Sequence, residues 1–287
     1  FNDPAALGEG TDWQKAVFND NARIQNHELS ISGSGDKSSY FGSFGYLDQE
    51  GIVTSSNSKF QRFTARFNAT HQISKRITFG NNVGYTHIRS VGVGTNSEYG
   101  TPLNRAINMD PLTPVIETDP AILSQAPYNG LSTSPFIVRD DKGNPYGISK
   151  YIGSEILNPL AAVKVAQGYG WSDKIVANVF TEIELIQGLK FRSSIGADLA
   201  FWGDASFQPL FYLNSINQNI TLNDYTRNNN RGLFYLWENT LSYQRSIDRH
   251  SFTLLAGTSA QKNKGEGNKN TKKGIPVTRI EDASMNF

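Results

Sequence analysis

The residue types best suited to chemistry in this sequence lack the spacing that catalysis or metal binding needs. The four histidines, His27, His71, His87 and His250, do not have metal-ligand spacing. There are no cysteines, so the chain has neither a thiolate metal site nor a disulfide framework. No nucleophile with a paired base stands out. The sequence therefore predicts no catalytic residue, no metal site and no cofactor, and it indicates a protein that is not an enzyme.

Two short segments carry residues that bind ions in other proteins, and each has a simpler interpretation. Asp140, Asp141 and Asn144 offer the oxygen ligands that calcium prefers, but their sequence, Asp-Asp-Lys-Gly-Asn-Pro, is more typical of a turn. Residues 33–38 are glycine-rich like a phosphate-binding loop, but they lack the Gly-Lys-Ser order and a following helix. We interpret 33–38 as a hairpin turn.

The elements that would position polar side chains in this chain are strands with one apolar and one polar face. Successive side chains of a strand point to opposite faces, so alternation with a period of two indicates a strand that is wet on one side. Between residues 62 and 73 the alternation is nearly unbroken. The odd positions hold Phe63, Ala65, Phe67, Ala69, His71 and Ile73, and the even positions hold Arg62, Thr64, Arg66, Asn68, Thr70 and Gln72.

Alternation of this kind, less regular in places, predicts eight strands. They lie at 24–32, 39–47, 62–73, 77–89, 174–185, 189–201, 233–243 and 250–259. Short links at about 33–38, 74–76, 186–188 and 246–249 alternate with long links at about 48–58, 90–172, 202–231 and 261–287. Membrane barrels have tight periplasmic turns and longer extracellular loops. A soluble sandwich or barrel, the alternative, has no reason to place every long loop at one end.

We therefore predict an all-β fold, an antiparallel transmembrane β-barrel segment of about eight strands with long extracellular loops. The expected organisation is an extracellular loop at 1–23, four strands within 24–89, a long extracellular loop at 90–172, four strands within 173–260 and a further extracellular loop at 261–287. One face of the strands would meet lipid and the other would line the lumen. The side chains expected to face the lumen are Arg62, Arg66, Asn68, Asn82, Glu182, Glu184, Lys190, Arg192 and Asp198.

The hairpin around 186–188 has a register that the sequence itself suggests. If Gly188 takes the left-handed position of a three-residue loop, Glu184 lies opposite Lys190 and Glu182 lies opposite Arg192. Opposite charges that face each other across a strand pair stabilise it slightly, so the two pairs support this register.

The loop at 90–172 is too long to be a passive link. Its density of proline, glycine, aspartate and asparagine excludes continuous sheet, and Pro102 indicates a short helix at 102–109. We expect the loop to bind a ligand or to form a cap. The loop aromatics that could stack on sugar rings, or instead pack the loops together, are Tyr128, Trp171, Trp202 and Tyr212.

The composition fits a membrane barrel and excludes several other classes. Hydrophobic residues make up only 38%, whereas 26 glycines, 12 tyrosines and 17 phenylalanines are plentiful, as expected where one face meets lipid and the other water. The formal net charge of +1 gives no bulk field for nucleic acid. No apolar run approaches the length of a membrane helix, and no signal peptide opens the chain, so we expect the start of an exported protein to be missing. We interpret the lysines of 261–287 as a solvated loop rather than a nucleic-acid or lipopolysaccharide site.

Several stretches of the chain resemble the SusC/RagA family of TonB-linked outer-membrane proteins of Bacteroidetes. They include Thr-Asp-Trp-Gln at 11–14, Phe-Gln-Arg-Phe-Thr-Ala-Arg-Phe-Asn at 60–68, Asn-Pro-Leu-Ala at 158–161 and His-Ser-Phe-Thr-Leu-Leu-Ala-Gly at 250–257. The block Tyr-Leu-Asp-Gln-Glu-Gly at 46–51 is quite specific. The resemblance spans nearly the whole chain.

The resemblance implies a barrel of roughly 22 strands that is filled by an N-terminal plug. It also implies a TonB box that couples transport to the proton gradient of the inner membrane. The expected partners are a SusD-like surface lipoprotein, the TonB complex reached through a missing N-terminal segment, an oligosaccharide or peptide substrate, and outer-membrane lipid, but no nucleic acid.

The leading hypothesis for function is TonB-dependent active import of a bulky nutrient, a glycan or a peptide, across the bacterial outer membrane. In this hypothesis the chain supplies barrel wall and outer loops in the cell outer membrane. The alternative is an outer-membrane binding or adhesion barrel without coupled transport. An outer-membrane hydrolase is a weaker third class, because no catalytic group supports it.

Overall fold

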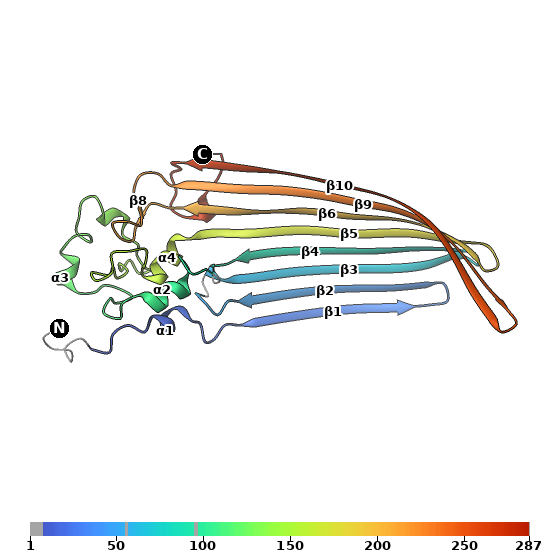
Figure 1. Ribbon diagram of the computed structural model, residues 1–287, viewed down its shortest axis with the longest axis horizontal. Helices are drawn as coiled ribbons and strands as arrows, with labels where there is room; N and C mark the ends of the chain where they lie inside the picture. Colours follow the sequence, from blue (N-terminus) through green and yellow to red (C-terminus); the bar gives the residue numbers. More distant parts are fainter. Residues whose placement is uncertain (1–7, 55–56, 95–96, 287) are drawn as a thin grey trace.

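The computed structural model describes residues 8–54, 57–94 and 97–286, and it consists of one large sheet with helices gathered at one end (Figure 1). Eight antiparallel strands lie in the order β1-β2-β3-β4-β5-β6-β9-β10. All eight predicted strands are therefore present. Their bounds are β1 (Ile24–Ser34), β2 (Ser38–Glu50), β3 (Lys59–Ser74), β4 (Ile77–Val91), β5 (Gln167–Ile186), β6 (Leu189–Gln208), β9 (Asp224–Ile247) and β10 (His250–Lys273).

The short connections lie at one end of the sheet and the long ones at the other (Figure 1). Tight turns at 35–37, 75–76, 187–188 and 248–249 close the four hairpins. Gly188 has a φ of +82° and Asp248 a φ of +53°, the left-handed conformation that tight hairpin turns use. The connections 51–58, 92–166 and 209–223 lie at the opposite end. The separation predicted from the link lengths is confirmed.

The pairing register gives the sheet one apolar face. Directly opposed residues of an antiparallel pair point to the same side, so Phe67, its partner Val83 and the next partner Ala177 share a face. Exposed members of this apolar face are Leu29, Ile31, Phe44, Phe63, Phe67, Val83, Ile175, Val179, Ile195, Trp237, Leu241 and Leu254. A soluble monomer rarely leaves a continuous apolar surface of this extent uncovered, whereas a barrel wall in lipid requires it.

Aromatic side chains lie at both ends of the apolar face. On β4, Tyr85 lies toward the loops and Phe79 toward the turns, about 20 Å apart at the usual rise of a strand. This spacing is close to the height of the apolar band of a membrane barrel, about 25 Å, where aromatic residues lie at both interfaces. Tyr235 and Tyr243 of β9 have the same arrangement.

The strands extend further toward the loops than predicted. β5 begins at Gln167, within the expected loop 90–172, and β10 continues to Lys273, within the expected loop 261–287. β6 and β9 likewise shorten the predicted link 202–231 to residues 209–223. The predicted boundaries were wrong because alternation of apolar and polar residues identifies only the part of a strand that has one apolar face. These strands continue beyond that part. The extension of β10 is polar on both faces, and backbone pairing with β9 holds it in the sheet.

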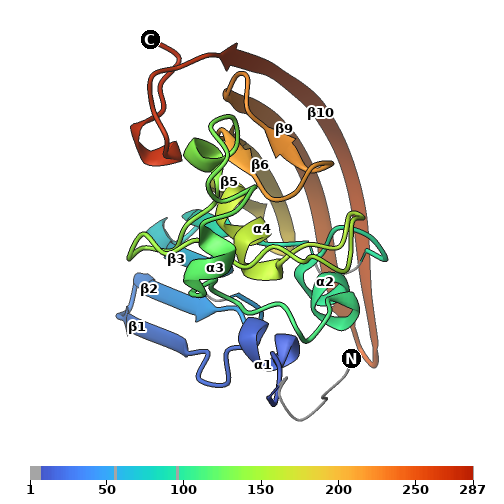
Figure 2. The same ribbon diagram turned by 90° about the vertical axis from the view of Figure 1, so that its left-hand side faces the viewer.

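Residues 92–166 form a helical cap at the loop end, together with α1 (Trp13–Val17) from the segment before β1 (Figure 2). The cap contains α2 (Pro102–Asn108), α3 (Pro120–Leu123), the 3₁₀ turn η3 (Ser134–Phe136) and α4 (Pro159–Val165). The helix predicted at 102–109 is confirmed as α2. A hydrophobic core of the cap joins Trp13 and Val17 of α1 to Ala106 of α2 and to Met109, which follows α2.

The three proline-led helices of the cap begin in the same way. Thr101, Asp119 and Asn158 each accept a hydrogen bond from a backbone N–H of the first turn, and proline follows each of them. A capping side chain satisfies a helix N–H group that has no helical partner, and proline at the first position loses no hydrogen bond. The local sequence therefore fixes where these short helices start.

The segment after β10 packs against the side of the sheet that bears the apolar face, at the loop end. Its Ile275 is buried with Ala205, Phe207 and Tyr225 of β6 and β9, and Val277 and Met285 pack beside them. This segment includes the 3₁₀ turn η4 (Ile280–Asp282), and the connection 209–223 contains the small pair β7 (Phe211–Tyr212) and β8 (Gln218–Asn219). No helix of the described residues is long and apolar enough to cross a membrane.

Candidate functional site

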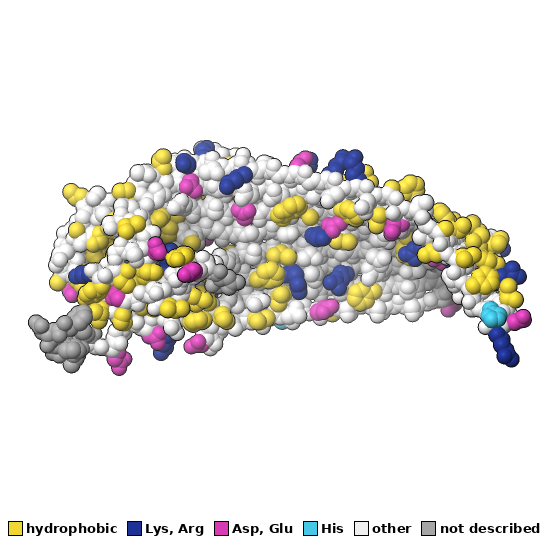
Figure 3. Space-filling view, in the orientation of Figure 1, with side chains coloured by type: hydrophobic (Ala, Val, Ile, Leu, Met, Phe, Trp, Pro, Cys, Tyr) yellow, Lys and Arg dark blue, Asp and Glu magenta, His cyan; other side chains and the backbone are white. Residues whose placement is uncertain are grey.

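The polar face of the sheet carries all nine side chains that were predicted to face the lumen. Asn68 pairs with Asn82, and Asn82 pairs with Asn178, so three amides form a row across β3, β4 and β5. The same register puts the remaining predicted residues on this side, opposite the exposed apolar side chains. Figure 3 shows the hollow of the molecule, along which side chains of both charges are scattered. The polar face is a wall that offers hydrogen bonds and both signs of charge.

Two predicted charge pairs have the expected register but different contacts. Glu184 and Lys190 are Cα partners, as are Glu182 and Arg192, so the register is confirmed. The Lys190 ammonium nevertheless reaches diagonally to Glu182, with Nζ 2.9 Å from Oε1. Arg192 lies over the ring of Phe180, 3.8 Å from its centroid. Diagonal neighbours are within reach of long side chains, and the arginine gains a cation–π contact.

Lys174 and Phe180 belong to the polar face but were not among the predicted residues. Lys174 Nζ lies 2.8 Å from Oδ2 of Asp198 on the neighbouring strand. Lys174 and Phe180 occupy even positions of β5, as Glu182 does, so all three side chains point to the same face. The alternation between 174 and 185 itself places Lys174 on the wet side, whereas an aromatic ring on the wet face breaks the pattern that defines that face.

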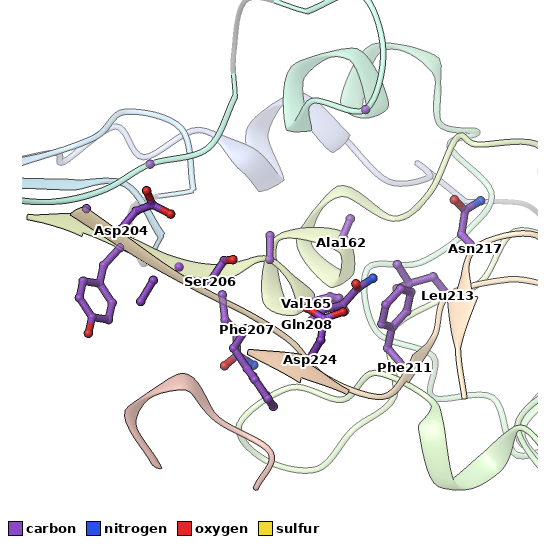
Figure 4. Close-up of a pocket in the computed structure, with 18 of the residues that line it drawn as sticks. Ala162, Val165, Asp204, Ser206, Phe207, Gln208, Phe211, Leu213, Asn217 and Asp224 are labelled. Atoms are coloured by element: carbon purple, nitrogen blue, oxygen red, sulfur yellow. The ribbon is translucent and has the colours of Figure 1, made fainter. Parts of the chain in front are cut away.

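A cavity of about 710 Å³ lies where the polar face meets the cap (Figure 4). The sheet contributes Asp204, Ser206 and Gln208 of β6, and α4 contributes Ala162 and Val165. Further lining side chains include Arg105, Phe211, Leu213, Asn217 and Asp224. A cavity of this size that combines apolar side chains with convergent polar groups is typical of a ligand site.

Arg105 of α2 is the least satisfied charged group that lines this cavity. Its Nε atom is buried and has no hydrogen-bond partner among the described residues. Burial also lowers the pKa of its guanidinium. Asp204 and Asp224 line the same cavity, and Asp204 accepts a hydrogen bond from Asn228. An arginine without a partner favours a carboxylate or another planar anion, so the cavity offers a cation and two carboxylates to a polar ligand. No local pattern in the sequence marks Arg105.

Four aromatic residues were predicted either to stack on a ligand or to pack the loops together. Two of them are buried in the cap, and the other two lie in strands of the sheet. Tyr128 and Tyr212 are only 6% and 9% exposed, and they pack around Ile137 inside the cap. Of the two roles that the sequence left open for them, stacking on a ligand or packing the loops, their burial favours packing, because these rings form a core of the cap. Trp171 and Trp202 lie in β5 and β6 rather than in loops. Trp202 is 42% exposed on the polar face, two residues before Asp204, and its ring lies over Gly232 of β9 rather than in the lining of the cavity.

The Asp-Asp-Lys-Gly-Asn-Pro segment is a turn, as interpreted. The carboxylate of Asp140 accepts hydrogen bonds from the backbone N–H groups of Lys142 and Asn144 at 2.9 and 2.8 Å. A further bond from the Asn144 amide is the main reason that the pKa of Asp140 is lowered. Asp141 is paired with Lys164 instead. Among residues 8–54, 57–94 and 97–286, no group of three or more acidic or histidine side chains is placed to hold a metal ion.

Sequence comparison relates the chain to TonB-dependent receptors. It is 29% identical over 257 residues to the TonB-dependent receptor P3 of Formosa agariphila, which covers 90% of this chain and 23% of that receptor. It is 31% identical over 205 residues to the TonB-dependent receptor SusC of Bacteroides thetaiotaomicron, which covers 69% of this chain and 19% of that receptor. No family model matches the sequence.

The fold agrees with a solved structure of the RagAB peptide transporter. The superposition has a TM-score of 0.70 at 21% identity and covers 94% of this chain and 28% of that chain. The RagAB peptide importer in its open-open state gives a TM-score of 0.69 at 22% identity. The chain belongs to the SusC/RagA family of TonB-dependent receptors. The predicted fold class, a segment of an antiparallel transmembrane β-barrel, is confirmed, and the chain spans about a quarter of the length of the curated SusC/RagA relatives it matches.

The block that most specifically resembles the SusC/RagA family has a structural role at the loop end of β2. The Tyr46 hydroxyl donates a hydrogen bond to Asp48 at 3.1 Å, and Lys59 Nζ lies 3.4 Å from the same carboxylate. Glu50 forms an ion pair with Arg23 at 3.0 Å. These contacts fasten β2 to the chain before β1 and to β3 where the sheet leaves the apolar band.

Proposed function

We propose that this chain forms barrel wall and outer loops of a TonB-dependent importer that carries a bulky nutrient, a glycan or a peptide, across the bacterial outer membrane. The observation that carries this proposal is the division of the sheet into an exposed apolar face and a charged polar face. Hydrocarbon accounts for the first face and a water-filled lumen for the second. The loops, including the expected extracellular loop 90–172, then lie outside the cell.

The substrate path begins at the cavity beneath the cap and continues down the polar wall. Arg105 and Asp204 supply charges at its entrance, and Trp202 supplies an exposed ring further along the same face of β6. Below them lie the nine predicted lumen residues. A stacking ring next to charged and amide groups suits sugar rings as well as peptide side chains. The printed name of SusC, a TonB-dependent receptor, agrees with TonB coupling, and RagAB is a peptide transporter, which agrees with the peptide class.

The cap is the proposed contact surface for a SusD-like surface lipoprotein. Large apolar side chains are exposed at the loop end, among them Leu131, which is fully exposed, Ile107 and Ile216. Exposed apolar groups beside polar ones are typical of a protein–protein contact. Coupling to the TonB complex is proposed to run through a segment outside this sequence.

The proposal is tested with the full-length receptor in its own bacterium. The gene is deleted, and growth is measured on individual glycans and on peptides as the carbon source. We expect growth on one substrate class to fail and to return with the intact gene. Trp202→Ala in the full-length gene should reduce uptake at limiting substrate by roughly 10-fold or more, because a buried stacking contact contributes about 1–3 kcal/mol.

The adhesion alternative predicts a different outcome of the same experiment. Deletion would then reduce attachment to a surface or a polymer and leave growth on every tested nutrient unchanged. Removal of the TonB box from the full-length receptor separates the two functions. An importer then loses uptake but keeps binding, whereas an adhesin, which imports nothing, keeps its attachment unchanged. Intact uptake without the TonB box would rule out the proposed coupling.

A further inference from the structure

The lysines of β10 divide between the two faces of the sheet. Lys262 and Lys264 pair with Tyr235 and Leu233 of β9, so both lie on the same side as the apolar face. Lys269 pairs with Asn228, which is on the polar side. The interpretation of these lysines as part of a solvated loop is wrong, because β10 continues to Lys273, and the register therefore determines which surroundings each ammonium group meets.

Lys262 and Lys264 lie at the upper edge of the apolar band, level with Tyr235 and Leu233 of β9. On β10 the last apolar residue of this face is Ala260, and the two lysines follow it by about 7 and 13 Å along the strand. Their partner Tyr235 marks the upper aromatic level on β9. The polar headgroup layer on each side of a bilayer is about 5–8 Å thick, and lysine side chains reach along a surface toward polar groups. Both ammonium groups therefore lie at headgroup height.

The charged groups near Lys262 and Lys264 have other partners, so the two ammonium groups can bind a ligand. Arg231 and Glu266, the next pair above them on the same face, form an ion pair with each other. Asp173 accepts hydrogen bonds from Tyr85 and His87 and lies on β5, away from β10. Within the described residues, neither Lys262 nor Lys264 has an ion pair. Two exposed cations at the lipid boundary thus have no counter-charge among the described residues.

We propose that Lys262 and Lys264 bind the phosphate groups of a phosphorylated glycolipid in the outer leaflet. This proposal rests on the proposed orientation of the sheet, with its apolar face toward lipid and its loops outside the cell. Charge complementarity identifies the occupant, because the phosphates of such a lipid lie at the height of the two lysines while its acyl chains cover Trp237 and Leu241 below. The site would fix β10 at a defined depth in the membrane.

The experiment compares two double variants of the full-length receptor. Lys262→Ala with Lys264→Ala removes the proposed site, and Lys269→Ala with Lys273→Ala removes the same charge from the opposite face of the same strand. The purified receptors are titrated in detergent with bisphosphorylated lipid A and with lipid A from which both phosphates have been removed. We expect the first variant to bind the bisphosphorylated lipid about 30-fold more weakly, as expected for two surface lysines, and the second to bind it like the wild type.

Three results would overturn the proposal. They are an equal loss in both variants, equally tight binding of the dephosphorylated lipid by the wild type, and binding of inorganic phosphate alone as tight as binding of the lipid. Folding of each variant is checked by heat-modified migration in gels, which reports barrel closure. Import is also measured on the wild type, and a wild-type receptor that binds the lipid as expected but imports neither substrate class would refute the proposed function and leave the lipid site standing.

Discussion

At the scale of single residues, the ion pairs of the polar face stabilise the sheet only slightly. The Lys190–Glu182 and Lys174–Asp198 pairs are both partly exposed, and pairs of this kind contribute about 0–1 kcal/mol. Backbone pairing along β5 and β6 holds the strands together instead. The charged side chains are therefore free to exchange their partners for groups on a passing ligand, which suits a transport wall better than a rigid network would.

The hydroxyl of Tyr128 forms two hydrogen bonds with backbone groups of the cap. It donates a hydrogen bond to the carbonyl of Tyr146 at 3.1 Å and accepts one from the N–H of Ile148 at 2.8 Å. Tyr128→Phe should lower the free energy of unfolding of the cap by about 1–3 kcal/mol, because both backbone groups lose this partner. Hydrogen exchange of the full-length receptor measures the change. Tyr99→Phe, at an exposed ring, is the control and should have no effect.

The same hydroxyl predicts a pH dependence. Burial is the main cause that raises the pKa of Tyr128 to about 12, above its usual value near 10. The folded cap holds this proton more tightly than the unfolded cap, so stability is level below pH 10 and falls as the pH rises toward 12. Hydrogen-exchange protection of the cap, corrected for the intrinsic exchange rate, should decline across this window and decline less in the Tyr128→Phe variant. Identical pH profiles would contradict the assignment.

At the scale of elements, one side chain joins α4 to the rest of the cap. Asn158 is 4% exposed, and its oxygen accepts hydrogen bonds from the N–H groups of Leu160 and Ala161. Its amide nitrogen donates to the carbonyls of Val115 and Gly147. The Asn-Pro-Leu-Ala stretch that resembles the family is thus a helix cap that also fastens two distant segments of the loop.

We expect Asn158→Ala to lower the stability of the cap by roughly 2–4 kcal/mol, because the helix loses its cap and two carbonyls lose a donor. Asn158→Asp keeps the capping oxygen but places a carboxylate oxygen against the carbonyls of Val115 and Gly147 at a buried position, so it should not restore the stability. Asn108→Ala, at an exposed helix end, is a control that should change little. Limited proteolysis of residues 92–166 in the full-length receptor ranks the variants. Equal resistance of Asn158→Ala and wild type would show that α4 does not depend on this residue.

The elements also show how far the sequence could predict the fold. The strands were predictable because the demand for one apolar and one wet face repeats every two residues. The cap was predictable only as a long loop with one helix, because its contacts join distant segments. The indole N–H of Trp13, for example, donates to the carbonyl of Asp110, 97 residues away. The cavity and Arg105 arise from the same long-range packing, which no local pattern encodes.

At the scale of the whole molecule, the sheet is curved and open. β1 and β10 are its two outer strands, and each pairs with a neighbour on one side only. An unpaired edge exposes backbone N–H and C=O groups, which is costly in lipid and promotes association in water. The exposed apolar face adds a second tendency to associate. The described sheet therefore needs further strands, or other copies of itself, to satisfy its edges.

The last prediction is that the 287-residue chain, expressed alone, does not give a stable soluble monomer. In buffer its apolar face and both edges should drive aggregation, and detergent should cover the apolar face but leave the edge hydrogen bonds unsatisfied. Size-exclusion chromatography with light scattering, and thermal melting followed by circular dichroism, should show polydisperse species without a cooperative transition in both media. The full-length receptor in detergent is the control, since a closed barrel has no free edge and should be monodisperse. A monodisperse, cooperatively melting monomer in buffer would mean that the exposed apolar face is covered by the chain itself, and the assignment of that face to lipid would then be wrong.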